Sequence, residues 1–448
     1  WILFPKVSSI HTVNISAAMI LSSPSLIALL VLYVIFCGMV MYFCVIADPN
    51  LSPMAMLIQV TLPQKIWATL EKVMGEKQMD MLQTFLDLSL AFVYFFVVLG
   101  CWTIVFYYIY PWIDESPHVG TYHKYIGYVV FLACFGSWRL ANKSSPGIIT
   151  TKSFIRYDHY PYDNLLFVPN RRCDTTNLIK IPRSKFDRLK YQQNVPRYDH
   201  FCGWVFNTIG EENYRWFLLF LAIHVVMCLY GSAVCILLFW GEIQERQLLQ
   251  ITFFDRATGE HIPSNWFIVS QYLFSRKTLE FAVLAVMFVM GIALGSFLGY
   301  HAYITSYNRT TNEDGKWSDI QKWYKKQQKK YKDAVKKGLV SPKPETNSTA
   351  SQEGPKVSDG DVTCTGGGYG LTNEANSSEE YYDPGPAPKN IYDRGFVENW
   401  KEVLFPISLR KEAVEMGGYS RPARTSQKQS VPNTKQPTQI PTESDKTD

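Results

Sequence analysis

Long runs without a charged side chain alternate with polar segments along the chain. Lys, Arg, Asp and Glu do not occur in residues 7–47, 88–113, 216–241 and 281–308. Each run supplies the ~20 apolar residues that a membrane-spanning helix needs. A weaker fifth run, residues 125–142, is interrupted only by Arg139, whose long side chain can reach the membrane interface. One such run also fits a buried core helix, but five in one chain predict an α-helical multi-pass membrane protein with about five transmembrane helices.

Basic residues beside the predicted spans indicate their orientation. Ten Lys and Arg residues lie between Lys143 and Arg215, and nine lysines lie within residues 316–337. The positive-inside rule makes both stretches cytosolic, which places the N-terminus in the lumen. Asn14, in Asn14-Ile15-Ser16, is then a usable glycosylation acceptor. The chain begins at Trp1 rather than Met, so we expect its natural N-terminus to lie further upstream.

The boundaries of the predicted segments follow from these runs and charges. The spans are expected at the end of a lumenal N-terminal segment (1–47) and at 84–112, 124–142, 214–240 and 278–304. Between them we expect a cytosolic loop (48–83), a lumenal loop (113–123), a small cytosolic domain between the third and fourth spans (143–213) and a second lumenal loop (241–277). A basic juxtamembrane segment (305–338) and a mostly disordered tail (339–448) follow.

Composition excludes several other classes of protein. Hydrophobic residues make up 47% of the chain and charged residues only 19%, against roughly 25% charged residues in soluble domains. Nine cysteines in 448 residues are too sparse for a secreted disulfide scaffold. From about Gly338, Ser, Thr, Pro and Gly dominate, which predicts disorder. Within that tail Trp400, Val403 and Leu404 fall on one helical face, so segment 390–406 is predicted to dock onto the rest of the chain.

The candidate chemistry lies in the predicted cytosolic domain. Asp199, His200 and Cys202 stand within four residues of one another, shortly before a predicted span. A cysteine attacks as its thiolate, a neighbouring imidazole can take its proton, and a carboxylate can fix the imidazole tautomer. The spacing alone favours a plainer alternative, a buried cysteine beside a histidine that is satisfied by hydrogen bonds.

The wider sequence resembles the DHHC protein S-acyltransferases, or palmitoyltransferases. That family has a cysteine-rich domain with an Asp-His-His-Cys core, a Thr-Thr-x-Glu motif after the last span and an aromatic C-terminal motif. The similar segments here are Ser145-Pro146-Gly147, Cys173-Asp174-Thr175-Thr176, Lys180-Ile181-Pro182-Arg183-Ser184, Arg197-Tyr198-Asp199-His200-Phe201-Cys202, Asn213-Tyr214-Arg215, Thr310-Thr311-Asn312-Glu313 and residues 390–405. The resemblance runs from about Tyr125 to Phe405 and looks closest to the endoplasmic reticulum and Golgi branch of the family.

The resemblance implies a role for each matching residue. It makes Cys202 the nucleophile and His200 and Asp199 the pair that activates it. The residues implied to brace the domain are Thr310, Thr311, Glu313, Asn390, Asn399 and Trp400. We also expect Arg183, Lys185 and Arg197 to meet the phosphates of acyl-CoA, although positive-inside charge explains these cations equally well.

The main departure from the family concerns metal. The family's domain resembles a pair of Cys3His zinc sites, and of those ligand positions only Cys173 is retained here. The other positions read Thr176, Phe186, Asp187, Lys190, Gln193 or Asn194, Phe201 and Thr208. One cysteine does not make a tetrahedral site. We therefore expect no structural zinc and no resident cofactor, with acyl-CoA as the co-substrate.

The sequence thus predicts a protein S-acyltransferase that moves palmitate or a similar chain from acyl-CoA to protein cysteines through an acyl-Cys202 intermediate. Its expected partners are the membrane, acyl-CoA and proteins with membrane-proximal cysteines, without nucleic acid. The expected location is the endoplasmic reticulum or Golgi membrane, with a cytosolic active site. The first alternative is a catalytically inactive membrane scaffold that recruits partners through its tail. A transporter or channel is a weaker alternative, since the spans hold almost no ionisable groups.

Overall fold

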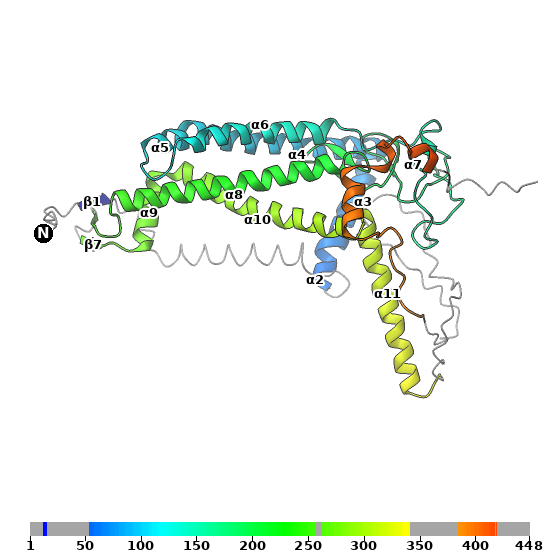
Figure 1. Cartoon of the computed structure of the whole chain (residues 1–448). Coiled ribbons are helices and arrows are strands. Elements are labelled where there is room, and N and C mark those ends of the chain that lie inside the picture. The colour runs from blue at the N-terminus through cyan, green and yellow to red at the C-terminus, as the bar shows by residue number, and fades with distance from the viewer. Residues whose placement is uncertain (1–11, 16–52, 256–260, 341–383, 417, 419–448) are drawn as a thin grey trace, which may run out of the picture.

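The computed structural model describes residues 12–15, 53–255, 261–340, 384–416 and 418. The predicted first span lies outside the described residues, and so does most of the segment predicted to be disordered. The described chain is mostly helical, with short strands at the two ends of a bundle of long helices (Figure 1).

Among the residues that the structure describes, three helices are long and apolar enough to cross a membrane. The first runs from Lys77 to Glu115 and combines most of α4 (Glu76–Ile104) with η4 (Val105–Ile109) and α5 (Tyr110–Glu115). The other two are α8 (Tyr214–Glu245) and α10 (Thr278–Ser306). The helix α6 (Tyr122–Lys143) occupies the predicted third span and packs along α8, but it is not one of the three. The described structure is therefore that of a membrane protein with three candidate spans, and the count of five stays a prediction.

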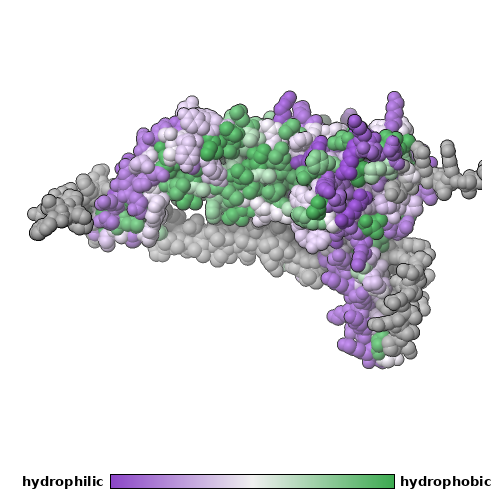
Figure 2. Space-filling model, viewed as in Figure 1, coloured by the Kyte–Doolittle hydropathy of each residue, from purple (hydrophilic) through white to green (hydrophobic). Residues whose placement is uncertain are grey.

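The middle of the bundle is apolar on its outer surface as well as inside. Figure 2 shows a hydrophobic band across the middle of the long helices, with hydrophilic side chains toward both ends. Inside the bundle, Ile113 of α5 packs with Leu238 of α8 and Val283 of α10. Helices that are apolar on all sides are typical of a lipid environment, because their outer surface contacts lipid rather than water and needs no polar side chains.

Two segments predicted as connections contain regular structure. In residues 48–83 the chain forms α2 (Pro53–Met56), η3 (Leu57–Thr61) and α3 (Leu62–Met74), and α4 already begins at Glu76. Gly75 separates α3 from α4 with φ of +85°, a backbone angle that glycine adopts without strain. In the second connection, β6 (Thr252–Asp255), β7 (His261–Pro263) and α9 (Trp266–Arg276) follow α8, and β1 (Thr12–Ile15) pairs in parallel with β6.

The small domain after α6 is built from short hairpins. It contains α7 (Phe154–Tyr157), the antiparallel pair β2 (Lys185–Asp187) and β3 (Gln193–Val195), and the pair β4 (His200–Cys202) and β5 (Asn207–Ile209). Gly210 follows β5 where the backbone of another segment comes close, since an added Cβ there would lie 2.9 Å from the Pro146 carbonyl oxygen. β5 also contacts α6, so the hairpin of β4 and β5 lies against the helical bundle.

The C-terminal part of the described chain returns to this domain. α11 (Thr311–Lys336) begins with a capping box, in which Thr310 and Glu313 satisfy each other's backbone N–H groups. In the described residues from 384 onward, the chain forms α12 (Phe396–Leu404), η5 (Ile407–Leu409) and α13 (Ala413–Met416). α12 packs on α10 and α8 and buries Val403 completely, whereas Leu404 is exposed rather than sharing the buried face.

Candidate active site

Strand β4 brings the predicted nucleophile and base to one side of the sheet. Alternate residues of a strand point the same way, so His200 and Cys202 share a face. The Nδ1 atom of His200 lies 2.5 Å from Oδ2 of Asp199. This contact leaves Nε2 for the thiol of Cys202, which lies within hydrogen-bonding reach of the ring. The three side chains form the acid–base–nucleophile order of a cysteine triad.

The N-terminus of α11 holds Asp199 in place. The backbone N–H of Thr311 donates to Oδ1 at 2.8 Å, and the Thr311 hydroxyl donates to Oδ2 at 2.9 Å. A helix N-terminus also favours a negative charge electrostatically. Thr311, predicted only to brace the domain, therefore contacts the carboxylate that orients the base.

The environment of the triad stabilises its ionised form. Burial acts to lower the pKa of His200, but the hydrogen bonds from its ring to Asp199 and Cys202 outweigh it and raise the pKa to about 10. Burial acts to raise the pKa of Asp199, but the hydrogen bond to His200 and the nearby positive charge lower it below its usual range. The imidazole between Asp199 and Cys202 is therefore favoured in its protonated form.

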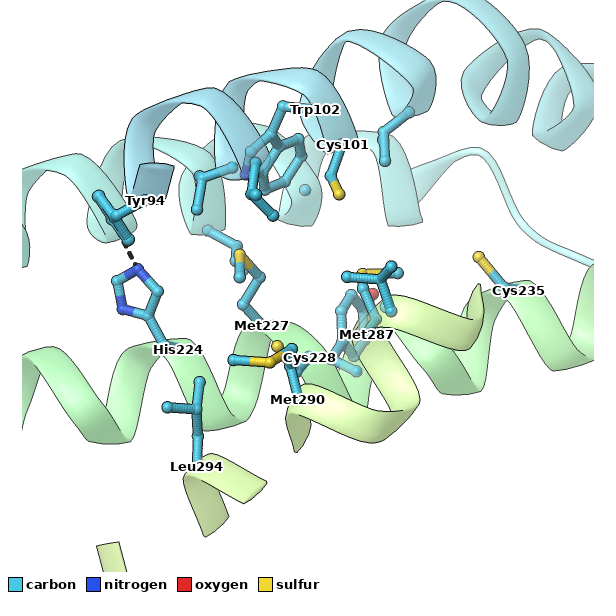
Figure 3. A pocket seen from close by; sticks show the side chains of 18 of the residues that line it. Tyr94, Cys101, Trp102, His224, Met227, Cys228, Cys235, Met287, Met290 and Leu294 are labelled. Carbon is cyan, nitrogen blue, oxygen red and sulfur yellow. Dashed lines mark hydrogen bonds between the residues drawn. The ribbon is translucent and has the colours of Figure 1, made fainter. Parts of the chain in front are cut away.

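Cys202 also borders an apolar cavity between the long helices. The cavity has a volume of about 400 Å³ and runs from Cys202, Trp204 and Phe217 toward Ile113 and Cys235, between α4, α6, α8 and α10. Figure 3 shows its middle, where Trp102, Met227, Met287 and Met290 face one another. Two hydrogen-bonded pairs interrupt its apolar wall: Tyr94 with His224 at 2.9 Å and His123 with Tyr230 at 2.5 Å. A thiol at the edge of such a cavity can meet the head of a long apolar chain that lies inside it.

A network of buried charged side chains lies near the triad and joins the hairpin domain to the C-terminal helices. Arg183 binds both carboxylate oxygens of Glu313 at 2.8 and 2.7 Å and donates to the Asn308 side chain at 2.9 Å. Glu402 of α12 lies 3.5 Å from Arg183 and 3.7 Å from Arg197. Burial acts to lower the pKa of Arg183, but Glu313 raises it, so the guanidinium keeps its charge. The network ties α10, α11 and α12 to the hairpin domain.

This network changes the interpretation of two predicted phosphate-binding cations. Arg183 is 1% exposed and Arg197 is 3% exposed, so neither reaches a surface where a phosphate group of CoA can bind. Both residues also have positive φ, +64° and +42°, which costs non-glycine residues free energy that the ion pairs offset. Of the three predicted cations only Lys185 lies near the surface, 5.0 Å above the ring of Tyr198.

The positions of the family's zinc ligands do not fit a zinc ion. Within the residues that the structure describes, no three His, Cys, Asp or Glu side chains cluster as metal ligands would. Near one former site the ammonium of Lys190 donates to the Phe206 carbonyl at 2.8 Å and to Asn207 Oδ1 at 3.0 Å. Near the other, Asn194 donates to Thr176 at 2.8 Å, next to the buried Cys173. Hydrogen bonds connect the hairpins where the family has metal.

Segment 390–406 binds the end of α10 through its polar side chains. The Asn399 amide donates to the Ser306 carbonyl at 2.8 Å, and the Trp400 indole donates to the Ser306 hydroxyl at 3.2 Å. The Asn390 amide donates to the Tyr307 carbonyl at 2.8 Å. Val403 of the same segment belongs to the buried cluster that contains Cys202. The tail motif therefore completes the packing around the nucleophile.

Comparison with known proteins links the chain to one family. Residues 167–318 match the model of the family described as DHHC palmitoyltransferase. It is similar to "Palmitoyltransferase SWF1" of Yarrowia lipolytica, with 28% identity over 316 residues that cover 66% of this chain and 74% of the relative. It is also similar to "Palmitoyltransferase ZDHHC4" of Mus musculus, with 30% identity over 200 residues that cover 44% of this chain and 57% of the relative. A relative from Neurospora crassa, also named "Palmitoyltransferase SWF1", shares 30% identity over 49% of its length. The chain thus spans about three quarters of the first of these relatives and about half of the other two.

Sequence reasoning missed several residues of the site. Asn308 accepts hydrogen bonds from Arg183 and Arg197 and donates one to the Tyr392 carbonyl, and it lies two positions before the Thr-Thr-x-Glu motif. Glu402 lies in segment 390–406 and pairs with Arg183. The sequence signal available for each was a polar residue beside or inside a recognised motif.

Proposed function

We propose that the chain is a protein S-acyltransferase that moves a long acyl chain from acyl-CoA to cysteines of other proteins through an acyl-Cys202 intermediate. One observation carries this proposal: the same thiol contacts the His200–Asp199 pair and borders the apolar cavity between the long helices. The match of residues 167–318 to the DHHC palmitoyltransferase model and the palmitoyltransferase names of the relatives support it.

In the first half-reaction, Cys202 takes the acyl group. With the thiol proton already on His200 Nε2, the Cys202 sulfur attacks the thioester carbonyl carbon. The carbon–sulfur bond to CoA breaks, and the leaving CoA thiolate takes that proton from the imidazolium. Asp199 stabilises that imidazolium throughout and does not itself become protonated.

In the second half-reaction, the acyl chain passes to a substrate protein. A substrate cysteine gives its proton to His200 and attacks the acyl carbon of the Cys202 thioester. The carbon–sulfur bond to Cys202 breaks, and the Cys202 thiolate takes the proton from the imidazolium. The site lies at the end of the spanning helices, so it reaches cysteines that lie close to the membrane. Membrane-proximal cysteines are therefore the proposed substrates.

The cavity supplies the binding energy for the acyl chain. Each buried CH2 group contributes about 0.8 kcal/mol, so an apolar chain is held by its length rather than by directed contacts. The lining residues Tyr94, Trp102, Met287 and Leu294 offer such a surface.

The remaining topology is also part of the proposal. We place α6 and the apolar segment before Asp48 in the membrane, which makes five spans with the N-terminus in the lumen and the active site in the cytosol. The two most basic segments, the hairpin domain and α11, lie on one side of the spans and support this orientation. We propose the endoplasmic reticulum or Golgi membrane as the location.

Autoacylation tests the proposed function directly. The full chain in detergent is given alkyne-labelled palmitoyl-CoA, with Cys202→Ser as the test variant and Cys235→Ser as the matched control. Cys235 is a buried thiol that lines the same cavity away from His200. We expect hydroxylamine-sensitive label on the wild type and on Cys235→Ser, no label on Cys202→Ser, and no zinc by mass spectrometry of the same sample. A folded wild type without label contradicts the enzyme and favours the inactive scaffold.

A further inference from the structure

Helix α11 carries a dense row of lysines that the proposed reaction does not use. The exposed lysines of α11 and the residue that follows it are Lys322, Lys325, Lys326, Lys329, Lys330, Lys332, Lys336 and Lys337. Beyond the first turn of this helix the acidic residues are only Asp319 and Asp333. We call these eight side chains the lysine face.

The lysine face lies opposite the buried face of the same helix. Trp317, Ile320 and Tyr324 are buried and pack with Leu165 and Leu166 of the hairpin domain. At 3.6 residues per turn the eight lysines project from the other side. The packing against the domain therefore fixes in which direction the charge points.

The position of α11 turns that charge toward the membrane. Figure 1 shows α11 leaving the end of α10 and running across the direction of the spans, so it lies along the membrane surface rather than away from it. In Figure 2 hydrophilic side chains cover the edge of α11 that faces the side of the spans. The lysine face is thus placed where lipid headgroups lie at the end of α10.

We propose that the lysine face binds anionic lipid headgroups of the leaflet at which the active site lies. Charge complementarity selects this occupant, because each Lys near an anionic surface strengthens attachment by about fivefold. Since Thr311 opens the same helix and holds Asp199, attachment of α11 also steadies the carboxylate that orients His200. The proposal needs the spans but does not depend on acyl transfer.

Lysine footprinting in a lipid bilayer tests this proposal. The full chain is placed in nanodiscs of phosphatidylcholine alone or with about one third phosphatidylserine, and treated with an acetylating reagent. Mass spectrometry then gives the rate for each lysine. We expect Lys325 and Lys329 to react about fivefold or more slowly with phosphatidylserine present, and to recover at about 1 M salt, where the Debye length is about 3 Å. Lys152, an exposed lysine of the hairpin domain, is the internal control and should not change.

Two variants separate the outcomes. Replacing Lys325, Lys326, Lys329 and Lys330 with Gln should restore fast acetylation of Lys332 and Lys336 in the anionic nanodiscs, without reducing autoacylation in detergent. The competing occupant is the acidic segment 341–383, in which eight Asp and Glu residues stand against two lysines. Equal rates in both nanodiscs overturn the proposal. Protection that is already present in phosphatidylcholine and is lost when Glu345, Glu353, Glu374, Glu379 and Glu380 become Gln overturns it in favour of that segment.

Discussion

Buried charge holds the hairpin domain to its neighbours, whereas apolar and aromatic packing holds the bundle of α4, α6, α8 and α10. Arg183 of the domain contacts Glu313 of α11 and Glu402 of α12, and each of the three is at most 4% exposed. In the bundle, the rings of Trp102 and Phe131 meet edge to face at 5.2 Å, without any polar partner in that contact.

The difference follows from the solvent on each side. The bundle lies among lipid chains, where an apolar side chain has a similar free energy whether it packs on a helix or on lipid. No single contact therefore dominates the stability of the bundle. Within the described residues the hairpin domain has no cluster of three metal-ligating side chains, and ion pairs such as Arg183–Glu313 join it to segments far away in the chain. Loss of one such contact leaves a buried partner charge without compensation.

The largest expected effect comes from Asp199, the carboxylate proposed to activate His200. Asp199→Asn keeps the size of the side chain but removes the charge that stabilises protonated His200. We expect acyl-Cys202 formation to slow by about 10²–10⁴-fold, measured as the initial rate of autoacylation at a temperature where the variant stays folded. Asp187→Asn is the control, since Asp187 is equally buried but accepts backbone N–H groups of Lys190 and Tyr191. Equal rate losses in the two variants would show that Asp199 acts only through the fold.

The buried ion pair is the next most sensitive contact. Arg183→Met removes the cation between Glu313 and Glu402 and is expected to lower the free energy of unfolding by about 3–5 kcal/mol. Thermal unfolding of the full chain in detergent measures this loss. Arg183→Lys should rescue it only in part, because an ammonium does not bind both oxygens of Glu313. A melting temperature for Arg183→Met equal to that of the wild type would contradict the supporting role of the network.

The pH dependence of stability sharpens the role of His200. Its pKa is raised from 6.5 to about 10 in the folded chain, so its protonation stabilises the fold fully below about pH 6.5. This contribution is lost as the pH rises through about 10. We therefore expect the difference in melting temperature between the wild type and His200→Gln to be largest near pH 6 and to shrink steadily from pH 7 to 10. A difference that grows with pH would mean that His200 is neutral in the folded chain.

The smallest expected effect lies in the bundle. Tyr94→Phe removes the hydroxyl that bonds His224 at 2.9 Å. Hydrogen bonds between spanning helices contribute about 0.6 kcal/mol on average, so the melting temperature should fall only slightly. Tyr94 also lines the cavity, and autoacylation with palmitoyl-CoA measured alongside should stay near the wild-type rate. A destabilisation as large as that of Arg183→Met would remove the contrast between the two regions.

Local patterns in the sequence predict the elements better than their contacts. The apolar runs coincide with α4, α8 and α10, and Thr310 and Glu313 mark the start of α11 through the spacing of a capping box. The burial of Arg183 and Arg197 was not predictable in this way, because their partners Glu313, Asn308 and Glu402 lie more than a hundred residues away in the chain. A cation in a basic segment looks the same in sequence whether it faces a phosphate, water or a buried carboxylate. The residues that line the cavity were likewise not predictable, since its wall combines residues of four helices.

The return of α12 to the hairpin domain has a consequence for how the protein is made. The Cys202 strand leaves the ribosome about 200 residues before Glu402 and Ser408, so at ordinary rates of translation it waits about 10–40 s for them. During that interval Arg183 and Arg197 lack the Glu402 carboxylate, and Glu211 lacks the Ser408 backbone N–H that it accepts. A nascent chain interrupted within residues 341–383 has complete spans but an unfinished catalytic domain. Such a fragment is expected to be a substrate for quality-control proteolysis rather than a slower form of the enzyme.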